Sequence, residues 1–400
     1  SIGAPPVLSV KKGDPVKKGQ RIAEPGGFVS VPLHSPASGT VGDLVEIIGV
    51  TGAPEQAVEI LSDGSDEWDT GLEPIPNWAD TDKEILKKRI LDAGIVGMGG
   101  AAFPTHVKLS PPPEKNIDTL IINGAECEPF LTADHRLMLE RTEEMLTGVA
   151  IAAKILRADR VFIGVEDNKM DAIEKLSASA EKYKIRVVPL HVKYPQGAEK
   201  QLIYALTRRQ VLEGGLPMDV GCVVMNAGTA AAVHDAVVLG HPLIERITTV
   251  TGTPVVDPAN YLVRIGTPIA RLLELSSGVK ENPAKVIMGG PMMGFAQSNI
   301  DIPVMKNTSG VLLMAPEEVE QFEGNPCIRC SRCVKACPMN LLVPSLSVMI
   351  EAEEFEMAEQ NYVMDCVECG TCAYICPAKR PLVQHFRRAK GEILARRRKK

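Results

Sequence analysis

The sequence is poor in aromatic residues and has no long run of apolar residues. Aromatic side chains make up 4% of the 400 residues, and the formal net charge is −6. Few rings for base stacking and a surplus of carboxylates both argue against nucleic-acid binding, which favours stacking platforms and a basic face for phosphate. No apolar stretch approaches the roughly 20 residues that a membrane-spanning helix needs. We therefore expect no nucleic-acid partner and no membrane span.

Cysteine is nearly absent from most of the chain, because only Cys127 and Cys222 precede residue 327. The others form two runs of four, each followed by proline: Cys327, Cys330, Cys333 and Cys337, then Cys366, Cys369, Cys372 and Cys376. Each run reads C-x2-C-x2-C-x3-C-P, the spacing by which bacterial ferredoxins hold [4Fe–4S] clusters. Zinc has no use for the third evenly spaced cysteine, and disulfides suit small secreted domains. We therefore expect two [4Fe–4S] clusters in a reducing compartment.

The fourth cysteine of each run is expected to serve the other cluster. The wider last gap and the proline carry it away from its own loop, and in two-cluster ferredoxins it ligates the opposite cube. We assign Cys327, Cys330, Cys333 and Cys376 to one cluster. We assign Cys366, Cys369, Cys372 and Cys337 to the other.

Residues 1–62 contain short alternating apolar runs separated by tight turns, which predicts short strands. This stretch resembles the barrel-sandwich hybrid of lipoyl and biotinyl domains. In those domains the modified lysine lies on a hairpin tip, and the corresponding position here is Phe28. Because the acceptor lysine is absent, we expect a structural module without lipoyl or biotinyl groups.

A glycine-rich loop at 94–105 follows an acidic, turn-rich linker at 62–82 and a short amphipathic helix at 82–91. Glycines at this density let backbone N–H groups approach a phosphate. A helix precedes the loop where the dinucleotide-binding fingerprint requires a strand. Taken alone, the loop fits a plain turn and a phosphate cradle equally well.

The loop and the polar turn after the apolar run 119–123 together resemble the flavin-binding subunit of respiratory complex I. That family carries G-R-G-G-A-G-F-P-T-G-L-K and then N-A-D-E-S-E-P, which hold FMN and the facing nicotinamide. The resemblance implies cofactor contacts at Gly97, Gly99, Gly100, Phe103 and Lys108, and at Asn123, Glu126 and Glu128. Met98 and Ala125 replace the family's arginine and aspartate.

Apolar runs at 160–166, 185–192 and 221–226 alternate with helical stretches such as 143–157 and 168–182, which predicts a mostly parallel sheet. Ligands bind such sheets at the strand ends, where polar turns at 194–199 and 226–229 are expected. These turns resemble further segments of the complex I flavin subunit. The resemblance implies FMN contacts at Glu199, Asn226 and Thr229. We expect structural roles for Cys127, His234 and His241.

Residues 243–302 resemble the β-grasp (SLBB) module that follows the flavin domain in complex I. Apolar positions at helical spacing within 342–362 predict helices between the cysteine runs, and hence a helical double-cubane ferredoxin domain. The expected fold is multidomain α/β. Its expected parts are a barrel-sandwich hybrid at 1–62, an FMN/NADH-binding α/β domain at 80–242, the SLBB domain at 243–302, the ferredoxin domain at 318–385 and a basic tail at 386–400.

This order of parts resembles the RnfC family of Rnf electron-transport complexes over essentially the whole chain. The resemblance implies an NADH-linked oxidoreductase subunit that passes electrons between NAD(H) and two [4Fe–4S] clusters through non-covalent FMN. Nicotinamide exchanges two electrons and a cubane one, so a flavin is needed between them. No residue is expected to act as acid, base or nucleophile. The expected partners are the other subunits of the membrane complex, including an iron–sulfur subunit.

The expected location is peripheral, on the cytoplasmic face of the membrane. Apolar residues of 379–393 can share one side of a helix flanked by basic residues, and we expect that side to dock on the bilayer or an acidic partner. Two alternative functions stay open: a cobalamin reductase-type flavo-iron–sulfur protein, and a non-catalytic relay or docking subunit.

Overall fold

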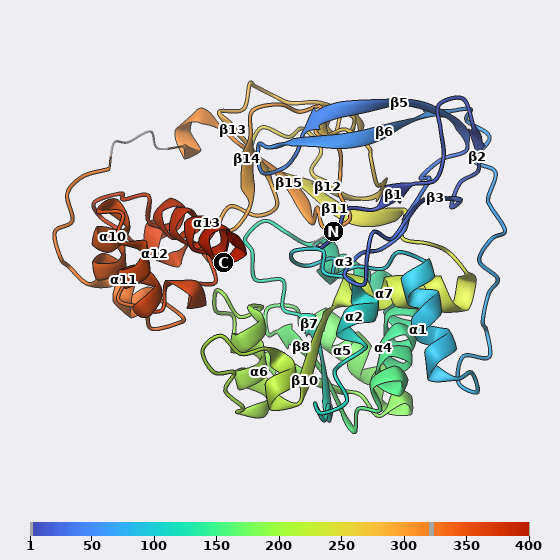
Figure 1. Ribbon diagram of the computed structural model, residues 1–400, viewed down its shortest axis with the longest axis horizontal. Coiled ribbons are helices and arrows are strands. Elements are labelled where there is room, and N and C mark those ends of the chain that lie inside the picture. Colours follow the sequence, from blue (N-terminus) through green and yellow to red (C-terminus); the bar gives the residue numbers. More distant parts are fainter. Residues whose placement is uncertain (1–2, 320–323, 400) are drawn as a thin grey trace.

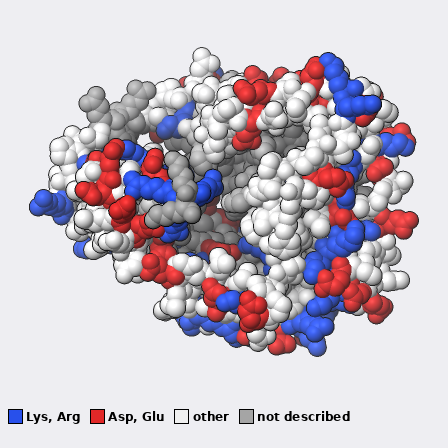
Figure 2. Space-filling model, viewed as in Figure 1, with Lys and Arg blue, Asp and Glu red and all other residues white. Residues whose placement is uncertain are grey.

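The computed structural model describes residues 3–319 and 324–399, which form four successive parts. In Figure 1 the C-terminal helices form a lobe of their own, and the N-terminal strands lie beside the sheet of the third part. Figure 2 shows this face of the molecule hollowed between that lobe and the rest, with positive and negative side chains interspersed. None of the described helices combines the length and the apolar character needed to cross a bilayer.

The first part consists of two three-stranded sheets packed around Val16, Ile22 and Val41. One sheet has the order β1-β3-β4 and the other β2-β5-β6. The hairpin tip carries Phe28, whose side chain is 68% exposed and whose carbonyl oxygen lies 3.1 Å from His106 Nε2. The tip therefore rests on the second part. The strands are β1 (Val7–Leu8), β2 (Pro15–Val16), β3 (Arg21–Glu24), β4 (Leu33–His34), β5 (Gly39–Ile48) and β6 (Pro54–Ser62).

The expected linker has little regular structure but is not a free tether. The ring of Trp68 stacks on His241 with centroids 4.4 Å apart, and Ile75 N donates to Val237 O over 2.8 Å. The segment therefore runs along the second part in a fixed path.

The second part is a four-stranded parallel sheet of order β10-β7-β8-β9 with helices around it. The predicted parallel sheet is confirmed. The strands are β7 (Thr119–Gly124), β8 (Arg160–Glu166), β9 (Arg186–Leu190) and β10 (Cys222–Asn226). The helices are α1 (Lys83–Asp92), α2 (Thr105–Lys108), α3 (Ala133–Glu140), α4 (Thr142–Leu156), α5 (Met170–Ala180), α6 (Glu199–Thr207), α7 (Ala227–His234) and the π-helical turn η3 (Asp235–Leu239).

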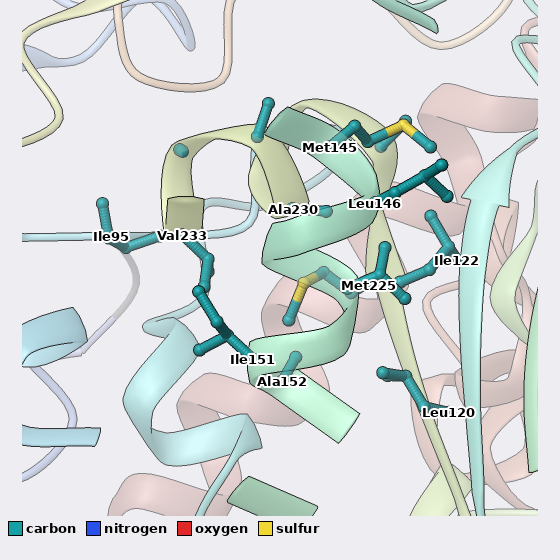
Figure 3. Packing of buried hydrophobic residues seen from close by; sticks show 14 of the residues in the cluster. Ile95, Leu120, Ile122, Met145, Leu146, Ile151, Ala152, Met225, Ala230 and Val233 are labelled. Carbon is teal, nitrogen blue, oxygen red and sulfur yellow. The ribbon is translucent and has the colours of Figure 1, made fainter. Parts of the chain in front are cut away.

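The core of this part fixes where α7 begins. Met145, Leu146 and Ile151 of α4 pack with Val233 of α7 and with Leu120 of β7 (Figure 3). Gly148 lets the two helices approach, because a Cβ there would lie 1.8 Å from the carbonyl oxygen of Ala230. This close packing places the first turn of α7 directly at the carboxyl end of β10.

The strand order of the second part creates a switch point. The chain builds β7, β8 and β9 in one direction and then adds β10 on the opposite side of β7. In open α/β sheets, ligands bind outside the carboxyl ends of the strands at the place where the order reverses. Here that place lies between β7 and β10.

The third part is a five-stranded mixed sheet of order β12-β11-β15-β13-β14, covered by α8 (Ile269–Leu275). The sheet continues past the expected boundary at residue 302, because β15 pairs with both β11 and β13. The strands are β11 (Glu245–Thr251), β12 (Ala259–Arg264), β13 (Lys285–Met288), β14 (Phe295–Gln297) and β15 (Gly310–Met314).

The fourth part is helical, as expected, with two helices inserted between the cysteine runs. Its helices are α9 (Arg332–Ala336), α10 (Val343–Glu351), α11 (Phe355–Gln360), α12 (Thr371–Tyr374) and α13 (Leu382–Lys399). Single 3-10 turns elsewhere are η1 (Glu181–Tyr183), η2 (Pro217–Val220), η4 (Pro316–Glu318) and η5 (Val363–Asp365).

The expectation for the C-terminal segment was wrong. Helix α13 crosses the expected boundary between residues 385 and 386, so residues 386–399 are not a separate tail. Leu382, Phe386, Ala389 and Ile393 are buried in one cluster with α10 and α11. The apolar side of α13, which we expected to dock on a membrane or partner, is therefore buried inside the fourth part.

Candidate functional site

Two of the expected site residues face each other at the switch point. Asn123 at the end of β7 and Asn226 at the end of β10 are register partners in the parallel ladder. Asn123 Nδ2 donates to Gly197 O over 2.8 Å, and its Oδ1 accepts from Ala125 N. Asn123 thereby ties the polar turn at 194–199 to the strand end.

Asn226 organises the opposite side of the crevice. Its Oδ1 accepts from Thr229 N and caps α7, while its Nδ2 donates to Asp134 Oδ2 over 2.6 Å. The same side chain lies against Gly99, where a Cβ would come within 2.8 Å of Nδ2. Only glycine fits position 99 without a shift of Asn226.

The glycine loop is held internally and by α7. Gly97 N donates to Phe103 O over 2.9 Å, and Met98 N donates to the buried hydroxyl of Thr229 over 2.9 Å. Thr229, expected to contact FMN, holds the loop through its hydroxyl. Gly99 and Gly100 at the tip are exposed, and a Cβ at Gly100 would meet nothing.

Side chains of the third part donate hydrogen bonds to the carbonyl groups of the same loop. Arg246 Nη1 donates to Met98 O over 3.1 Å, Lys306 Nζ to Gly94 O over 2.7 Å, and Asn307 Nδ2 to Gly100 O over 2.9 Å. Burial lowers the pKa of Arg246 to about 10 and that of Lys306 to about 7. Three carbonyls are thus occupied by side chains of the neighbouring domain.

Lys108 and Glu199, expected from separate motifs, meet beside the strand ends. Lys108 Nζ lies 3.0 Å from Glu199 Oε1 and 3.1 Å from Val224 O. Both side chains remain about one-third exposed or more, at 34% and 40%. The pair therefore forms a polar wall that a ligand can reach.

Glu126 is partly buried and faces the start of α3. Its carboxylate accepts from the backbone N–H groups of Asp134 and His135 at the start of α3. Burial, followed by the neighbouring Asp134 carboxyl, raises the pKa of Glu126 to about 7. Burial raises the pKa of Asp134 as well. The carboxyl of Glu126 therefore lies close to that of Asp134, which contacts Asn226 at the crevice.

Glu128 connects the second part to the third. Its carboxylate accepts from Met292 N over 3.1 Å and from Met293 N over 2.8 Å. Burial raises its pKa. Glu128 thus shares the turn after β7 with Glu126 but points toward a different partner.

The residues expected to be structural behave so. Burial raises the pKa of Cys127 to about 11, and its sulfur accepts from Gly197 N. A thiol with a raised pKa is a poor nucleophile. His234 bonds to Asp235, and His241 stacks on Trp68.

Four cysteines from both runs surround one pocket in the fourth part. Cys337 of the first run lies with Cys366, Cys369 and Cys372 of the second around a pocket that Phe386 and Leu341 also line. No three His, Cys, Asp or Glu side chains within residues 3–319 and 324–399 converge closely enough for a single metal ion. Four thiols set apart around a cavity suit a cluster rather than one ion.

Of the remaining four cysteines, Cys327, Cys333 and Cys376 lie near one another. Burial raises the pKa of Cys333, with smaller contributions from the nearby thiols of Cys376 and Cys327. Cys376 of the second run therefore lies with the first run. Cys327 and Cys330 are exposed. We call this group the outer set and the pocket with Cys337, Cys366, Cys369 and Cys372 the inner set.

The inner set directly contacts the second part, which resembles the complex I flavin domain. Tyr194 OH donates to Cys369 O over 2.7 Å. Gln201 Nε2 donates to Pro338 O over 3.0 Å. Gly370 abuts the third part, because a Cβ there would lie 2.6 Å from Met292 O.

Sequence reasoning missed the residues that join the parts. Tyr194, Gln201, Arg246 and Lys306 lie far in sequence from the groups that they contact. A signal existed for Arg246, which stands in a strand whose central positions are otherwise apolar or hydroxylated. No comparable signal marked Tyr194 or Gln201.

Family models match all four parts. The matches are the RnfC barrel sandwich hybrid domain over residues 1–65, the Nuo51 FMN-binding domain over 90–235, the SLBB domain over 247–296 and the 4Fe-4S dicluster domain over 326–380.

Curated relatives match over the full length. The chain is 50% identical over 392 residues to a component of the proton-translocating ferredoxin:NAD(+) oxidoreductase complex of Clostridium ljungdahlii, covering 98% of this chain and 86% of that protein. It is 48% identical to a component of the Na(+)-translocating ferredoxin:NAD(+) oxidoreductase complex of Acetobacterium woodii, covering 100% of this chain and 90% of that protein.

Among solved structures, the fold resembles a chain of an NAD+-reducing [NiFe]-hydrogenase in the H2-reduced state. The TM-score is 0.57 at 18% identity, covering 79% of this chain and 64% of that chain. This likeness concerns the fold alone. The full-length relatives and the four successive domain matches place the chain in the RnfC family of ion-translocating oxidoreductase complexes.

Proposed function

We propose that this chain is the NAD(H)-linked electron-transfer subunit of an ion-translocating ferredoxin:NAD+ oxidoreductase complex. Its relatives belong to complexes of that name, and its domains are those of an FMN- and 4Fe-4S-containing oxidoreductase. Bound FMN would supply the exchange between two-electron nicotinamide and one-electron clusters. The observation that carries the proposal is the hydrogen bond from Tyr194 to Cys369, which joins the second part, matched by the FMN-binding domain model, to the inner set.

The residues at the switch point fit a phosphorylated flavin. The exposed tip at Gly99 and Gly100 offers backbone without side-chain obstruction, and its position is fixed by contacts to the carbonyls of Gly94, Met98 and Gly100. Amide groups in such a loop bind phosphate oxygens. No residue that would attach the flavin covalently is recognisable, so we expect acid precipitation to release it.

We assign the residues by what each is free to do. Gly99, Gly100, Phe103, Lys108 and Glu199 are the candidates for direct contact with FMN or nicotinamide, because they remain at least partly exposed. Gly97, Asn123, Glu126, Glu128, Asn226 and Thr229 are candidates for holding the crevice in shape, since the structure occupies them in internal hydrogen bonds. None is placed as acid, base or nucleophile.

The two sets of cysteines would each hold one [4Fe–4S] cluster. The crossed arrangement is testable at Cys337, which lies in the first run but lines the pocket of the second. We expect Cys337→Ala to lose the cluster held by Cys366, Cys369 and Cys372. Iron analysis should fall from about eight to about four per chain, and loss of the outer cluster instead would contradict the assignment.

We infer that residues 1–62, 80–242, 243–315 and 324–399 are the domains of this protein. We further infer a peripheral position on the cytoplasmic face of the membrane, held by the other subunits of the complex, including one with iron–sulfur clusters. The matched RnfC barrel at the N-terminus favours this function over a cobalamin reductase.

The test is the visible spectrum of anaerobically purified protein before and after addition of NADH. We expect NADH to bleach the absorbance band of the flavin. A decrease in the broad visible absorbance of the iron–sulfur clusters should follow. A protein that binds no flavin, or whose flavin NADH does not bleach, would instead be a non-catalytic relay.

A further inference from the structure

The two cysteine runs differ in the charges around them. Between Gly324 and Ile350 the chain has no Asp or Glu, but it has Arg329, Arg332 and Lys335, all exposed. In the second run the one charged residue, Glu368, is neutralised within the fold by Arg387 and Lys390 at 3.0 and 2.6 Å.

The cations of the first run differ from most of those on α13 in their ion pairing. Within the described parts of the chain, no ion pair involves Arg329, Arg332 or Lys335. Along α13, Arg388 pairs with Glu353, Arg396 with Glu356, and Arg397 with Glu359. Among the described residues, the first run therefore presents three unpaired cations to solvent, whereas most cations of α13 are paired.

This charge surrounds exposed apolar groups at the outer set. Arg332 and Lys335 are three residues apart on α9 and so share one side of it. Ile328, between Cys327 and Arg329, is 67% exposed. Tyr374 is 76% exposed and ends α12, which packs on α9. Apolar and aromatic groups flanked by arginines are typical of protein interfaces.

The outer set is also where electrons can leave or enter. Cys327 and Cys330 are exposed, whereas the inner set faces Tyr194, Gln201 and Met292 of the other domains. A partner that exchanges electrons with this chain must approach the outer set. A bilayer lying on the same surface would cover these cysteines and close that route.

We propose that Ile328, Arg329, Arg332, Lys335 and Tyr374 form a docking surface for an acidic iron–sulfur protein. This rests on the proposed function, because it takes the outer set to hold a redox-active cluster. In each encounter one electron passes from the reduced cluster of the partner to the outer cluster, so that the first is oxidised and the second reduced. No bond is formed, and the complementary charges bring the two clusters together.

The test compares two triple variants of the full, cluster-loaded chain. Arg329→Glu/Arg332→Glu/Lys335→Glu reverses the charge of the surface. Arg186→Glu/Lys193→Glu/Lys280→Glu makes the same change in net charge at exposed positions elsewhere, where the described chain provides no ion pair. The probe is a reduced, acidic two-cluster ferredoxin, whose oxidation is followed by anaerobic stopped-flow.

Attraction between opposite charges raises association rates and is screened by salt. We expect the second-order rate of the unaltered chain and of the control to fall steeply as salt increases. The surface variant should be at least about tenfold slower at low salt and nearly independent of salt. Equal rates in all three proteins, or no salt dependence in the unaltered chain, would overturn the proposal.

Two parallel measurements separate the explanations. Iron content and bleaching by NADH, recorded on the same samples, report on the proposed function without involving the surface. Binding to phosphatidylserine vesicles tests a lipid partner: if the surface variant loses vesicle binding but oxidises ferredoxin as fast as the control, the surface contacts the membrane and the docking proposal is wrong.

Discussion

At the scale of single residues, the peptide at Met98 is held from both sides. Its N–H donates to Thr229 of the flavin-like domain, and its carbonyl accepts from Arg246 of the SLBB domain. A loop that cradles phosphate must present its amides in fixed directions, because each misplaced donor loses the contact. The complex I family has an arginine where this chain has Met98. In this chain Arg246 of the SLBB domain brings a cation to the carbonyl of Met98 instead.

The first prediction concerns Thr229→Val, which keeps the shape of the side chain and removes the hydroxyl. Met98 N then lacks its acceptor, at a cost of about 1–3 kcal/mol for a buried donor. We expect weaker FMN binding, measured by quenching of flavin fluorescence. Thr142→Val is the control, since Thr142 is a buried threonine of the same domain whose hydroxyl bonds to Met138 O. Equal loss of FMN affinity in both variants would refute a specific role for Thr229.

The second prediction concerns pH. Glu126 has its pKa raised to about 7 from 4.5, chiefly by burial. The folded protein therefore binds this proton more tightly than the unfolded chain, and stability from this group is lost as pH rises from about 4.5 to about 7. Glu126→Gln removes that loss, which is at most about 3 kcal/mol.

The measurement is the melting temperature of both proteins between pH 5 and pH 8. We expect the difference between Glu126→Gln and the unaltered chain to move in favour of the variant as pH rises. Glu213→Gln, at an exposed position, serves as the control. Parallel curves for the Glu126 variant and the unaltered chain would show that this carboxyl does not titrate in that window.

At the scale of elements, α13 closes the fourth domain. Its apolar side lies on α10 and α11, and its basic side pairs with carboxylates there. Burial of large apolar side chains contributes far more to stability than exposed ion pairs do. The apolar side, rather than the charges, should therefore decide whether the domain folds.

The third prediction follows from that difference. Phe386→Ala should destabilise the fourth domain by about 3–5 kcal/mol, and because Phe386 lines the inner pocket, the protein should also lose iron. Arg396→Gln/Arg397→Gln should change stability by no more than about 1 kcal/mol. Thermal unfolding and iron analysis provide the measurements. Comparable effects of the two variants would mean that the ion pairs carry the stability of α13.

Sequence pattern was sufficient for elements with local signals. Continuous apolar runs predicted β7, β8 and β10, the amphipathic pattern at 82–91 predicted α1, and helical spacing predicted α10. It was insufficient for β15 and for the orientation of α13. Whether an apolar side faces solvent or another helix depends on tertiary packing, which the periodicity of one segment does not contain.

The features of the candidate site also fall into those that the sequence predicted and those that it did not. The cysteine spacing predicted cluster ligands, four of which line one pocket, and the apolar runs with the polar turns after them located both strand ends, where Asn123 and Asn226 are register partners. The sequence did not show that Thr229, Glu126 and Glu128 are occupied by internal partners. Such occupancy depends on residues from other elements, and the contacts of Arg246 and Lys306 with the loop cross between domains.

At the scale of the whole molecule, the helical lobe (Figure 1) contacts the rest of the chain near the inner set. The polar contacts there are Tyr194 with Cys369, Gln201 with Pro338, and the ion pair of Lys200 with Asp365 at 3.6 Å. Arg387 also lies over the ring of Phe295, 4.6 Å from its centroid. These contacts hold the inner set against the second part. Under the proposed function, electrons would pass between the crevice, the inner set, the outer set and the partner in that order.

The last prediction tests that order with Tyr194→Phe, which removes the hydroxyl but keeps the ring. The lost hydrogen bond is worth about 1 kcal/mol, or about a fivefold shift in the ratio of docked to undocked lobes. Bleaching of the flavin by NADH should keep its rate, because the crevice residues are untouched, while the following reduction of the clusters should slow. Stopped-flow absorbance separates the two phases. Tyr204→Phe, on the exposed side of α6, is the matched control. If Tyr194→Phe slows the flavin phase instead, the tyrosine serves the crevice and not the contact with the clusters, and the inner set is reached by another route.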